Sequence, residues 1–381
     1  MVQSAVSAPA PRRVALMLES DGPGGAEVML FHLADELRRR GHYVLPVGPQ
    51  AGSGWLAERF RERGFEPATF MLRSPVDVRC WRDLVALLRD RRIDVVHSHE
   101  FTMGVYGGFA ANSLSVPHVI TMHGGRYYAQ RWRRRAALGW AAARSRALVG
   151  VSDATADDLK RTLPSVADRV RVVPNGIPFA AGHRAGTRAA LGLGDANRLI
   201  LAVGNLYHVK GHDVLLRAFA RIANEAAASA WTVAIAGRGE AEASLRQLAA
   251  DLGIADRVQL LGLRSDVPDL LAAADLFTLP SRSEGLPLAL IEAMGASLPI
   301  VSTEVGGIAE VVRRDVEALL VPPENPAQMA SALATLIGDP DRRLALGAAA
   351  RRRATSAYSV ESMGDRYEAL YNAAPDNASI E

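Results

Sequence analysis

The chain has 381 residues, of which 49% are hydrophobic and 22% charged, and these values are ordinary for a protein that buries sizeable cores. This composition excludes an intrinsically disordered chain, and the length predicts two or three domains. The one cysteine, Cys80, excludes an intramolecular disulfide framework and a zinc site built from thiolates.

The net charge is only +3, but the charges are unevenly distributed. Basic residues outnumber acidic ones over residues 1–180, and acidic residues outnumber basic ones over 181–381. Between Phe101 and Ser152 there is no acidic residue, although several arginines fall there. Such a basic segment suits an anionic membrane surface, a nucleic acid or a phosphorylated ligand, or it is a solvated helix face.

Short apolar runs alternate with helical patterns along the first half of the chain. Unbroken apolar runs are typical of strands covered on both faces, and hence of a parallel sheet. The run at 14–18 is followed by a glycine-rich loop and by a helix over 26–40 that Gly41 closes. Further strands are expected at 43–47, 66–70, 93–97, 118–122 and 147–151, and the turn residues of 171–178 end the series.

A second series of the same kind follows an Ala/Gly-rich stretch, 180–197, which we interpret as a linker. Its strands are expected at 199–203, 232–236, 258–261, 276–279, 299–302 and 319–321. The sequence therefore predicts two doubly wound, Rossmann-like α/β domains with parallel sheets facing a central cleft, an N-terminal domain over 1–178 and a C-terminal domain over 179–357. A final helix at about 358–373 is expected to pack back on the N-terminal domain, and the tail 374–381 to be frayed.

The chain shows no targeting or membrane-spanning pattern. Its first residues include no apolar run, and the longest uncharged stretch, 101–125, contains Asn, Ser, Pro and His. A helix followed by a strand explains that stretch better than a membrane span. We therefore expect a cytoplasmic protein.

The strongest motif is SRSEGLPLALIEA at 281–293, directly after an expected strand. Its turn leads into a helix that starts near Pro287, and the free N–H groups of that helix start suit a diphosphate. Glu284 precedes the helix and Glu292 lies within it, so the two carboxylates can accept hydrogen bonds from hydroxyl groups on two parts of one ligand. Alternatively, they are a glutamate that favours the helix dipole and an exposed helix glutamate.

Two strand ends in the first half carry histidines. His123 ends one strand and is followed by Gly124 and Gly125, which is a cleft-edge position in an open α/β sheet. His99 lines an acceptor pocket or merely caps its strand, and Arg126 is a second acceptor-side candidate. Near the N-terminus, Gly24 and Gly25 precede a helix and permit close approach of a phosphate or sugar, or they serve only the turn.

Several known cofactor signatures are missing from the sequence. There is no G-x-G-x-x-G at the first glycine-rich loop, no Walker A motif, no H-E-x-x-H and no Cys/His metal spacing. No D-x-D pair stands in a suitable loop either. We therefore expect no cofactor and no bound metal.

The motif at 281–293 resembles that of the retaining glycosyltransferases of the GT-B fold, specifically glycosyltransferase family 4. Further similarities to that family follow along nearly the whole chain in the family's order. They are GGAE at 24–27, VHSH at 96–99, TMHG at 121–124, VPNGI at 173–177, KGHD at 210–213, AGRGE at 236–240 and LGLRSDVPDLLAAADLFTLPS at 261–281.

This resemblance implies a metal-independent hexosyltransferase whose co-substrate is a UDP- or GDP-linked sugar. Glu292 would bind the ribose hydroxyls, Glu284 the donor sugar, and Lys210 the leaving phosphate. His123 would contact the sugar or its phosphate near the reacting carbon. Catalytic roles would thus fall to His123, Lys210 and Glu284, and further nucleotide-sugar contacts to Gly25, Asn205, Gly237, Arg238, Gly285, Leu286 and Pro287.

One position departs from the family pattern. Family members commonly have an arginine after the glycine of the first loop in the second half, whereas this chain has Asn205 after Gly204. Asparagine offers hydrogen bonds but no charge. Either His208 or Arg238 compensates, or Lys210 carries more of the stabilisation.

Function classes other than a glycosyltransferase stay open at this point. They are another GT-B-like enzyme, such as a sugar-nucleotide epimerase, and a non-catalytic sugar-nucleotide binding protein. The expected acceptor is a sugar or a lipid-linked molecule in glycan, exopolysaccharide or glycolipid assembly, and no nucleic-acid partner is expected. The basic segment 131–146 would hold the protein peripherally at the inner face of the plasma membrane, or it is a solvated arginine face.

Overall fold

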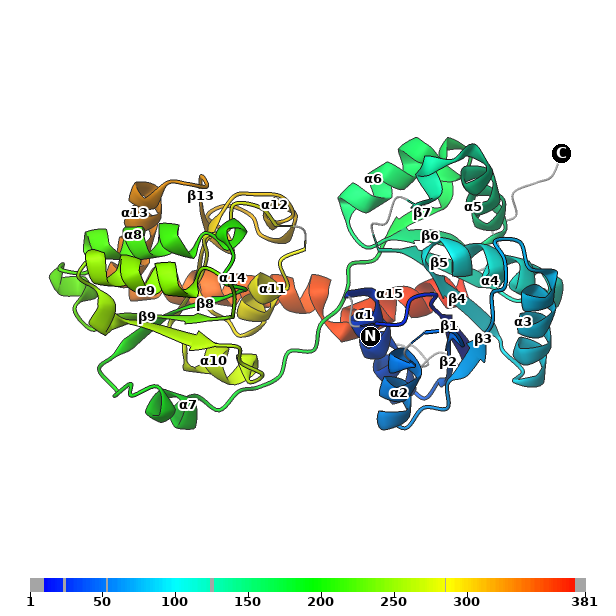
Figure 1. The fold of residues 1–381 in the computed structure, drawn as a ribbon, viewed down its shortest axis with the longest axis horizontal. Helices are drawn as coiled ribbons and strands as arrows, with labels where there is room; N and C mark the ends of the chain where they lie inside the picture. Colours follow the sequence, from blue (N-terminus) through cyan, green and yellow to red (C-terminus); the bar gives the residue numbers. More distant parts are fainter. Residues whose placement is uncertain (1–9, 23–24, 53, 124–126, 285, 374–381) are drawn as a thin grey trace, which may run out of the picture. The chain divides into compact units, whose positions relative to one another are not determined.

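A computed structural model describes residues 10–22, 25–52, 54–123, 127–284 and 286–373 (Figure 1). These residues form two compact units. The first contains the described residues up to Pro178 together with those from Ser359 onward, and the second is Phe179–Tyr358. Among the described residues, no helix combines the length and the apolar character needed to span a membrane.

The first unit is built on a parallel sheet of seven strands in the order β3-β2-β1-β4-β5-β6-β7. Side chains alternate across each strand, so one strand serves two cores. From β1, Val14 and Leu16 face one core, and Ala15 and Met17 face the other. The strands are β1 (Arg13–Met17), β2 (Tyr43–Pro49), β3 (Ala68–Phe70), β4 (Val95–His99), β5 (His118–Met122), β6 (Ala147–Gly150) and β7 (Val170–Val172).

Helices cover both faces of this sheet, which explains the unbroken apolar runs of its strands. They are α1 (Gly25–Arg39), α2 (Trp55–Glu62), α3 (Val78–Asp90), α4 (Glu100–Leu114), α5 (Trp132–Arg144), α6 (Asp153–Thr162) and α15 (Val360–Asn372), with 3₁₀ turns at Tyr127–Gln130 and Pro164–Arg169.

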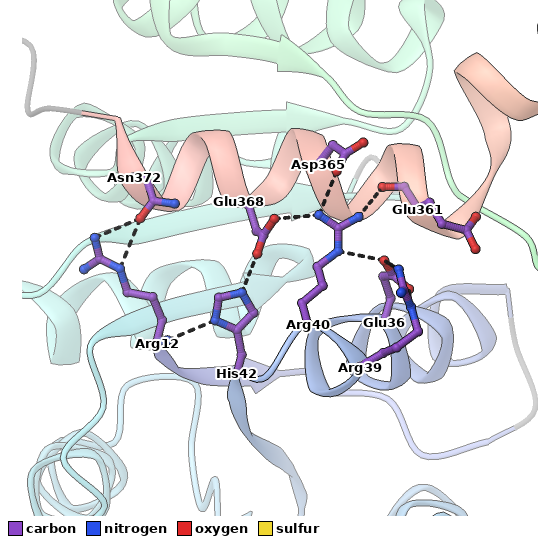
Figure 2. A network of polar contacts seen from close by, with 9 residues as sticks. All are labelled: Arg12, Glu36, Arg39, Arg40, His42, Glu361, Asp365, Glu368 and Asn372. Atoms are coloured by element: carbon purple, nitrogen blue, oxygen red, sulfur yellow. Dashed lines mark hydrogen bonds and ion pairs between the residues drawn. The ribbon is translucent and has the colours of Figure 1, made fainter. Parts of the chain in front are cut away.

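The last helix, α15, packs against α1 and is fixed there by polar contacts (Figure 2). The Arg40 guanidinium contacts Glu36 at 2.7 Å, Asp365 at 2.7 Å and Glu368 at 2.5 Å. Glu368 also lies 2.6 Å from Nε2 of His42, whose ring is buried. A partly buried arginine shared by several carboxylates holds its partners more firmly than an exposed pair does, so α15 belongs structurally to the first unit.

The second unit has a parallel sheet of six strands in the order β10-β9-β8-β11-β12-β13. One large core gathers residues of β8, β9, α8 and α13. The strands are β8 (Arg198–Val203), β9 (Trp231–Ala236), β10 (Val258–Gly262), β11 (Leu276–Leu279), β12 (Ile300–Thr303) and β13 (Leu319–Val321). The helices are α7 (Arg184–Ala190), α8 (His212–Ile222), α9 (Glu242–Asp251), α10 (Val267–Ala273), α11 (Leu288–Gly295), α12 (Ile308–Val311), α13 (Pro326–Gly338) and α14 (Pro340–Tyr358), with 3₁₀ turns at His208–Lys210, Ala226–Ala228 and Ala255–Arg257.

The predicted α/β class with two parallel sheets is confirmed, but two local expectations are wrong. The segment 171–178 was expected to end the first series with turn residues, but its first two residues belong to β7, an edge strand beside β6. The expected linker 180–197 contains α7, whose Arg188 is buried and donates to the carbonyls of Ala273 and Asn197. Because these carbonyls and the Asp275 carboxylate satisfy the guanidinium, a segment that looks solvated in sequence packs as structure.

Candidate functional site

The polar site of the second unit lies where its strand order reverses. The chain runs from β8 outward through β9 to β10 and then returns to β11 on the other side of β8. The loops that follow β8 and β11 therefore leave the same sheet edge in opposite directions, and ligands bind at such a point in open α/β sheets. The loop after β8 carries Lys210, and the loop after β11 carries Glu284.

Two glycines allow the loops at this edge to approach one another. Gly211 has a φ of +64°, and a Cβ atom there would lie 2.1 Å from the carbonyl oxygen of Pro280. Gly237, at the end of β9, would place a Cβ atom 1.9 Å from the carbonyl oxygen of Gly204. A side chain at either position would clash with a facing backbone carbonyl, so both positions require glycine.

Lys210 and Glu284 form an ion pair across the switch point. Nζ of Lys210 lies 2.8 Å from Oε1 and 3.0 Å from Oε2 of Glu284. Ser281 Oγ donates to the same Oε1 at 2.6 Å and so orients the carboxylate. The Lys210 side chain is 25% exposed and that of Glu284 is 8% exposed, so the lysine is the accessible member of the pair.

A cluster of polar contacts around Arg282, which the sequence reasoning did not assign, connects the two loops. Arg282 donates to both carboxylate oxygens of Asp213, at 2.8 and 2.9 Å, and to Glu324 at 3.0 Å. It also donates to the carbonyl of His208 at 2.6 Å. Hydrogen bonds to Asp213 and Glu324 raise the pKa of Arg282. The signal was present, because Arg282 and Asp213 lie inside the two motifs quoted for the resemblance.

Glu292 lies on α11, the helix that follows the Glu284 loop, and its carboxylate has no partner within the described part of the protein. No hydrogen bond or ion pair reaches it there, and burial raises its pKa. A half-buried carboxylate without a protein partner is suited to a hydroxyl-bearing ligand.

The remaining predicted residues of the second unit differ in their exposure. Asn205 and Arg238 are exposed, and so is His208, so none of them is already committed to a buried contact. Leu286 is half-buried and Pro287 buried immediately before α11. Gly285 lies outside the described residues.

In the first unit, His99 and His123 meet at the carboxyl edge of neighbouring strands. Nδ1 of His99 lies 3.0 Å from Nε2 of His123, and the two rings stack 5.3 Å apart. Burial lowers the pKa of His123 to about 4 and that of His99 well below its ordinary value, so both rings are neutral at pH 7. His99 Nε2 and His123 Nδ1 are buried and have no partner among the described residues.

Carboxylates that the sequence reasoning missed lie beside these histidines. Glu100 follows β4 in a left-handed backbone conformation, with a φ of +65°, which is uncommon outside glycine. Its Oε1 accepts from the backbone N–H of His123 at 3.0 Å. Burial, together with the charges of Glu19 and Glu27, raises the pKa of Glu100 to about 7. Gly25 is the first residue of α1, and Glu27 lies in the first turn of the same helix. Gly24 and Arg126 lie outside the described residues.

The structure thus groups the predicted residues into two sets, each within one unit. Lys210, Glu284 and Glu292 belong to the second unit, and His99 and His123 to the first. Within the described residues, no three His, Cys, Asp or Glu side chains are grouped so that they could hold a metal ion.

Comparisons with known proteins agree with this architecture. Residues 23–180 match the family described as Glycosyltransferase Family 4, and residues 197–339 match Glycosyl transferases group 1. The chain is 32% identical over 326 residues to D-inositol 3-phosphate glycosyltransferase of Thermobispora bispora, covering 77% of this chain and 76% of that one. It is 31% identical over 408 residues to alpha-maltose-1-phosphate synthase of Mycolicibacterium smegmatis, covering 94% and 98%.

Among solved structures, Anabaena Alr3699/HepE in complex with UDP matches with a TM-score of 0.72 at 21% identity, covering 93% of this chain and 98% of that one. This likeness shows the GT-B fold. The family matches cover both units, and the curated relatives share about a third of their residues with this chain over most of its length. The chain therefore belongs to glycosyltransferase family 4 and is a glycosyltransferase.

Proposed function

We propose that the protein is a retaining glycosyltransferase that moves a sugar from a UDP- or GDP-linked donor to an acceptor hydroxyl in glycan, exopolysaccharide or glycolipid assembly. The donor would bind to the second unit and the acceptor to the first. The structural neighbour Alr3699/HepE was solved with UDP, and another structure of that protein with UDP-glucose, which supports a uridine donor as the first to test.

The observation that carries the proposal is the Lys210–Glu284 pair at the switch point, with the unoccupied Glu292 carboxylate on the following helix. A donor diphosphate is a stronger anionic partner for Lys210 than one carboxylate, because it offers two phosphates in the same place. When Lys210 turns to the phosphate, the Glu284 oxygens become free to accept hydrogen bonds from the sugar hydroxyls. Glu292 accepts from the ribose hydroxyls.

The same geometry explains how transfer would be promoted. As the bond between the anomeric carbon and the phosphate oxygen breaks, negative charge collects on the departing diphosphate. Lys210 stabilises that charge more strongly than it stabilises the bound donor, and this difference accelerates the reaction. The departing phosphate oxygen takes the proton of the acceptor hydroxyl, which attacks the same face of the sugar that the leaving group vacates. The family resemblance assigns His123 a contact with the sugar or its phosphate, and its ring is neutral because burial lowers its pKa.

Nucleotide titration of Glu292→Ala tests the donor site. Calorimetry with UDP and GDP should show that the wild-type protein binds one of them, and that the variant binds it about 10- to 100-fold more weakly, the scale of a hydrogen bond to a charged group. Glu225→Ala is the matched control, because Glu225 is an exposed glutamate of the same unit that lies beyond the end of α8. Equal affinity in wild type and Glu292→Ala would overturn the ribose assignment.

Product analysis tests the rest of the proposal. With UDP-glucose or GDP-mannose, whichever base the titration selects, the product should keep the anomeric configuration of the donor, as read from its proton NMR coupling constants. An inverted product contradicts the retaining mechanism. A protein that binds the nucleotide but transfers no sugar to any acceptor would be a non-catalytic binding protein.

A further inference from the structure

A series of buried hydrogen bonds connects α15 to His97, which lies beside the His99–His123 pair. Oη of Tyr371 lies 2.7 Å from Nδ1 of His97, and Nε2 of His97 lies 2.8 Å from Oγ1 of Thr121. Oγ1 of Thr121 in turn lies 3.0 Å from Oη of Tyr367. All four side chains are fully buried, so water does not compete for these hydrogen bonds.

These hydrogen bonds hold the His97 ring at both of its nitrogens. Burial lowers the pKa of His97 well below its ordinary value, so the ring is neutral, with one nitrogen that donates and one that accepts. Hydroxyl groups on both sides satisfy either arrangement. Loss of one hydroxyl would leave a buried ring nitrogen without a partner, and the ring would then move or tilt to recover a contact.

The fixed His97 ring contacts the His99–His123 pair at the sheet edge. The rings of His97 and His99 stack with centroids 4.3 Å apart. Within the described residues, the His99 ring makes one hydrogen bond, to His123, and its other nitrogen has none. The stacking contact with His97 therefore helps to fix the direction in which the His99 ring presents Nδ1 to His123.

We propose that Tyr371 and Tyr367 of α15, acting through His97 and Thr121, are positioning residues for the His99–His123 pair. This inference rests on the proposed function, in which His123 contacts the sugar or its phosphate. It gives the return of α15 to the first unit a role beyond docking. The docking contacts of Figure 2 lie on other side chains of the same helix, Asp365, Glu368 and Asn372, so the two roles can be separated by mutation.

Tyr371→Phe is the decisive variant, since it removes one hydroxyl and keeps the ring. We expect turnover to fall about tenfold, because small displacements of a reacting group cost that much or more, while the affinity for UDP or GDP stays within about twofold of wild type. The ring nitrogen NMR signals of His97, His99 and His123 in the full-length, ligand-free protein should all move. This spectrum requires no substrate.

Two controls separate positioning from general destabilisation. Tyr106→Phe removes a buried hydroxyl of the same unit, one that accepts from the backbone N–H of Asp77 at 2.7 Å and contacts none of these histidines. Glu368→Gln weakens the docking of α15 and removes no hydrogen bond between Tyr371, His97, Thr121 and Tyr367. Both should leave the His99 and His123 signals and the turnover near those of wild type.

Thr121 gives a rescue test within the same chain. Thr121→Val should reduce turnover and shift the histidine signals, whereas Thr121→Ser, which keeps the hydroxyl, should restore both. The proposal is overturned if Tyr371→Phe leaves the His99 and His123 signals unmoved, or if Glu368→Gln lowers turnover as much as Tyr371→Phe does. If His123→Ala transfers sugar at the wild-type rate, the proposed role of His123 fails, and the NMR signals alone then decide whether the tyrosines position the pair.

Discussion

The two units share one fold, but the polar groups at their site edges differ. The edge of the second unit is ionic, with Lys210 paired to Glu284 and Arg282 shared by Asp213 and Glu324. The edge of the first unit holds the neutral rings of His99 and His123 beside Glu100, which burial brings to a pKa of about 7. Strand order alone therefore does not decide the chemistry of a doubly wound sheet edge.

The difference teaches what each edge is suited to bind. Accessible cations in a polar network favour a diphosphate and the charge that grows on it. Buried neutral rings with unsatisfied nitrogens favour uncharged hydroxyl groups, since they offer hydrogen bonds without attracting anions. We therefore propose that the second unit binds the charged donor and the first unit binds hydroxyl groups, which can be tested at each edge.

The largest expected effect comes from removing the cation of the ionic edge. Lys210→Ala should lower kcat about 10²- to 10³-fold, while the affinity for UDP or GDP falls much less, because the contact strengthens as charge develops on the phosphate. Steady-state kinetics and calorimetry measure the two quantities. Lys160→Ala, at the other lysine of the chain and on the surface of the first unit, is the control. An unchanged kcat with weakened donor affinity would assign Lys210 to binding only.

The second prediction concerns positive charge that the first unit carries on α5 rather than at its site edge. Arg131, Arg133 and Arg135 are exposed, and Trp132 is 66% exposed beside them, whereas Leu138 faces the core. We propose that this face contacts anionic membranes. Replacement of Arg133, Arg134 and Arg135 with serine should weaken the affinity for anionic vesicles about a hundredfold at low salt, because each charge contributes about 1 kcal/mol. Vesicle sedimentation measures this affinity.

Donor affinity should be the same in that triple variant as in wild type. Replacement of Arg59, Arg61 and Arg63 of the same unit with serine changes the net charge equally and should leave sedimentation intact. Wild-type protein that stays in the supernatant with anionic vesicles at low salt would contradict membrane contact.

The edge of the first unit predicts a dependence of stability on pH. A carboxyl whose pKa rises from 4.5 to about 7 on folding keeps its proton better in the native state, so Glu100 makes the free energy of unfolding fall as pH rises from about 4.5 to 7. Glu100→Gln should remove that loss and raise stability by about 3 kcal/mol at pH 8, with no gain at pH 4. Urea unfolding followed by tryptophan fluorescence reports mainly on the first unit, which holds four of the five tryptophans. Glu66→Gln, at a side chain that is 88% exposed, should show no such pH dependence.

The smallest expected effect is that of chelation. Because Lys210 and the start of α11 offer positive charge to the diphosphate, EDTA should leave turnover unchanged. Turnover assays with and without EDTA, followed by Mg²⁺ or Mn²⁺, measure this. Activity that is lost in EDTA and restored by either ion would show that the ionic edge does not neutralise the donor by itself.

Much of the fold could be read from the sequence, because strands covered on both faces must be apolar throughout. The expected runs at 118–122, 276–279 and 319–321 coincide with β5, β11 and β13. The edge strand β7 escaped notice because its three residues include an exposed arginine and no long apolar run. Helix α7 escaped because the partners of Arg188 are carbonyls that only the fold brings to it.

The sequence by itself determined the family and singled out candidate residues for its chemistry, since Lys210, Glu284, Glu292 and His123 stand in recognisable motifs after strands. Only the tertiary structure decided how polar groups pair. Lys210 meets Glu284 across 74 residues of chain because β8 and β11 are neighbours, and Tyr371 meets His97 across 274 residues because α15 returns to the first unit. The physical reason is that apolar periodicity reports burial and local conformation, whereas strand order and helix docking set which buried donors and acceptors must satisfy one another.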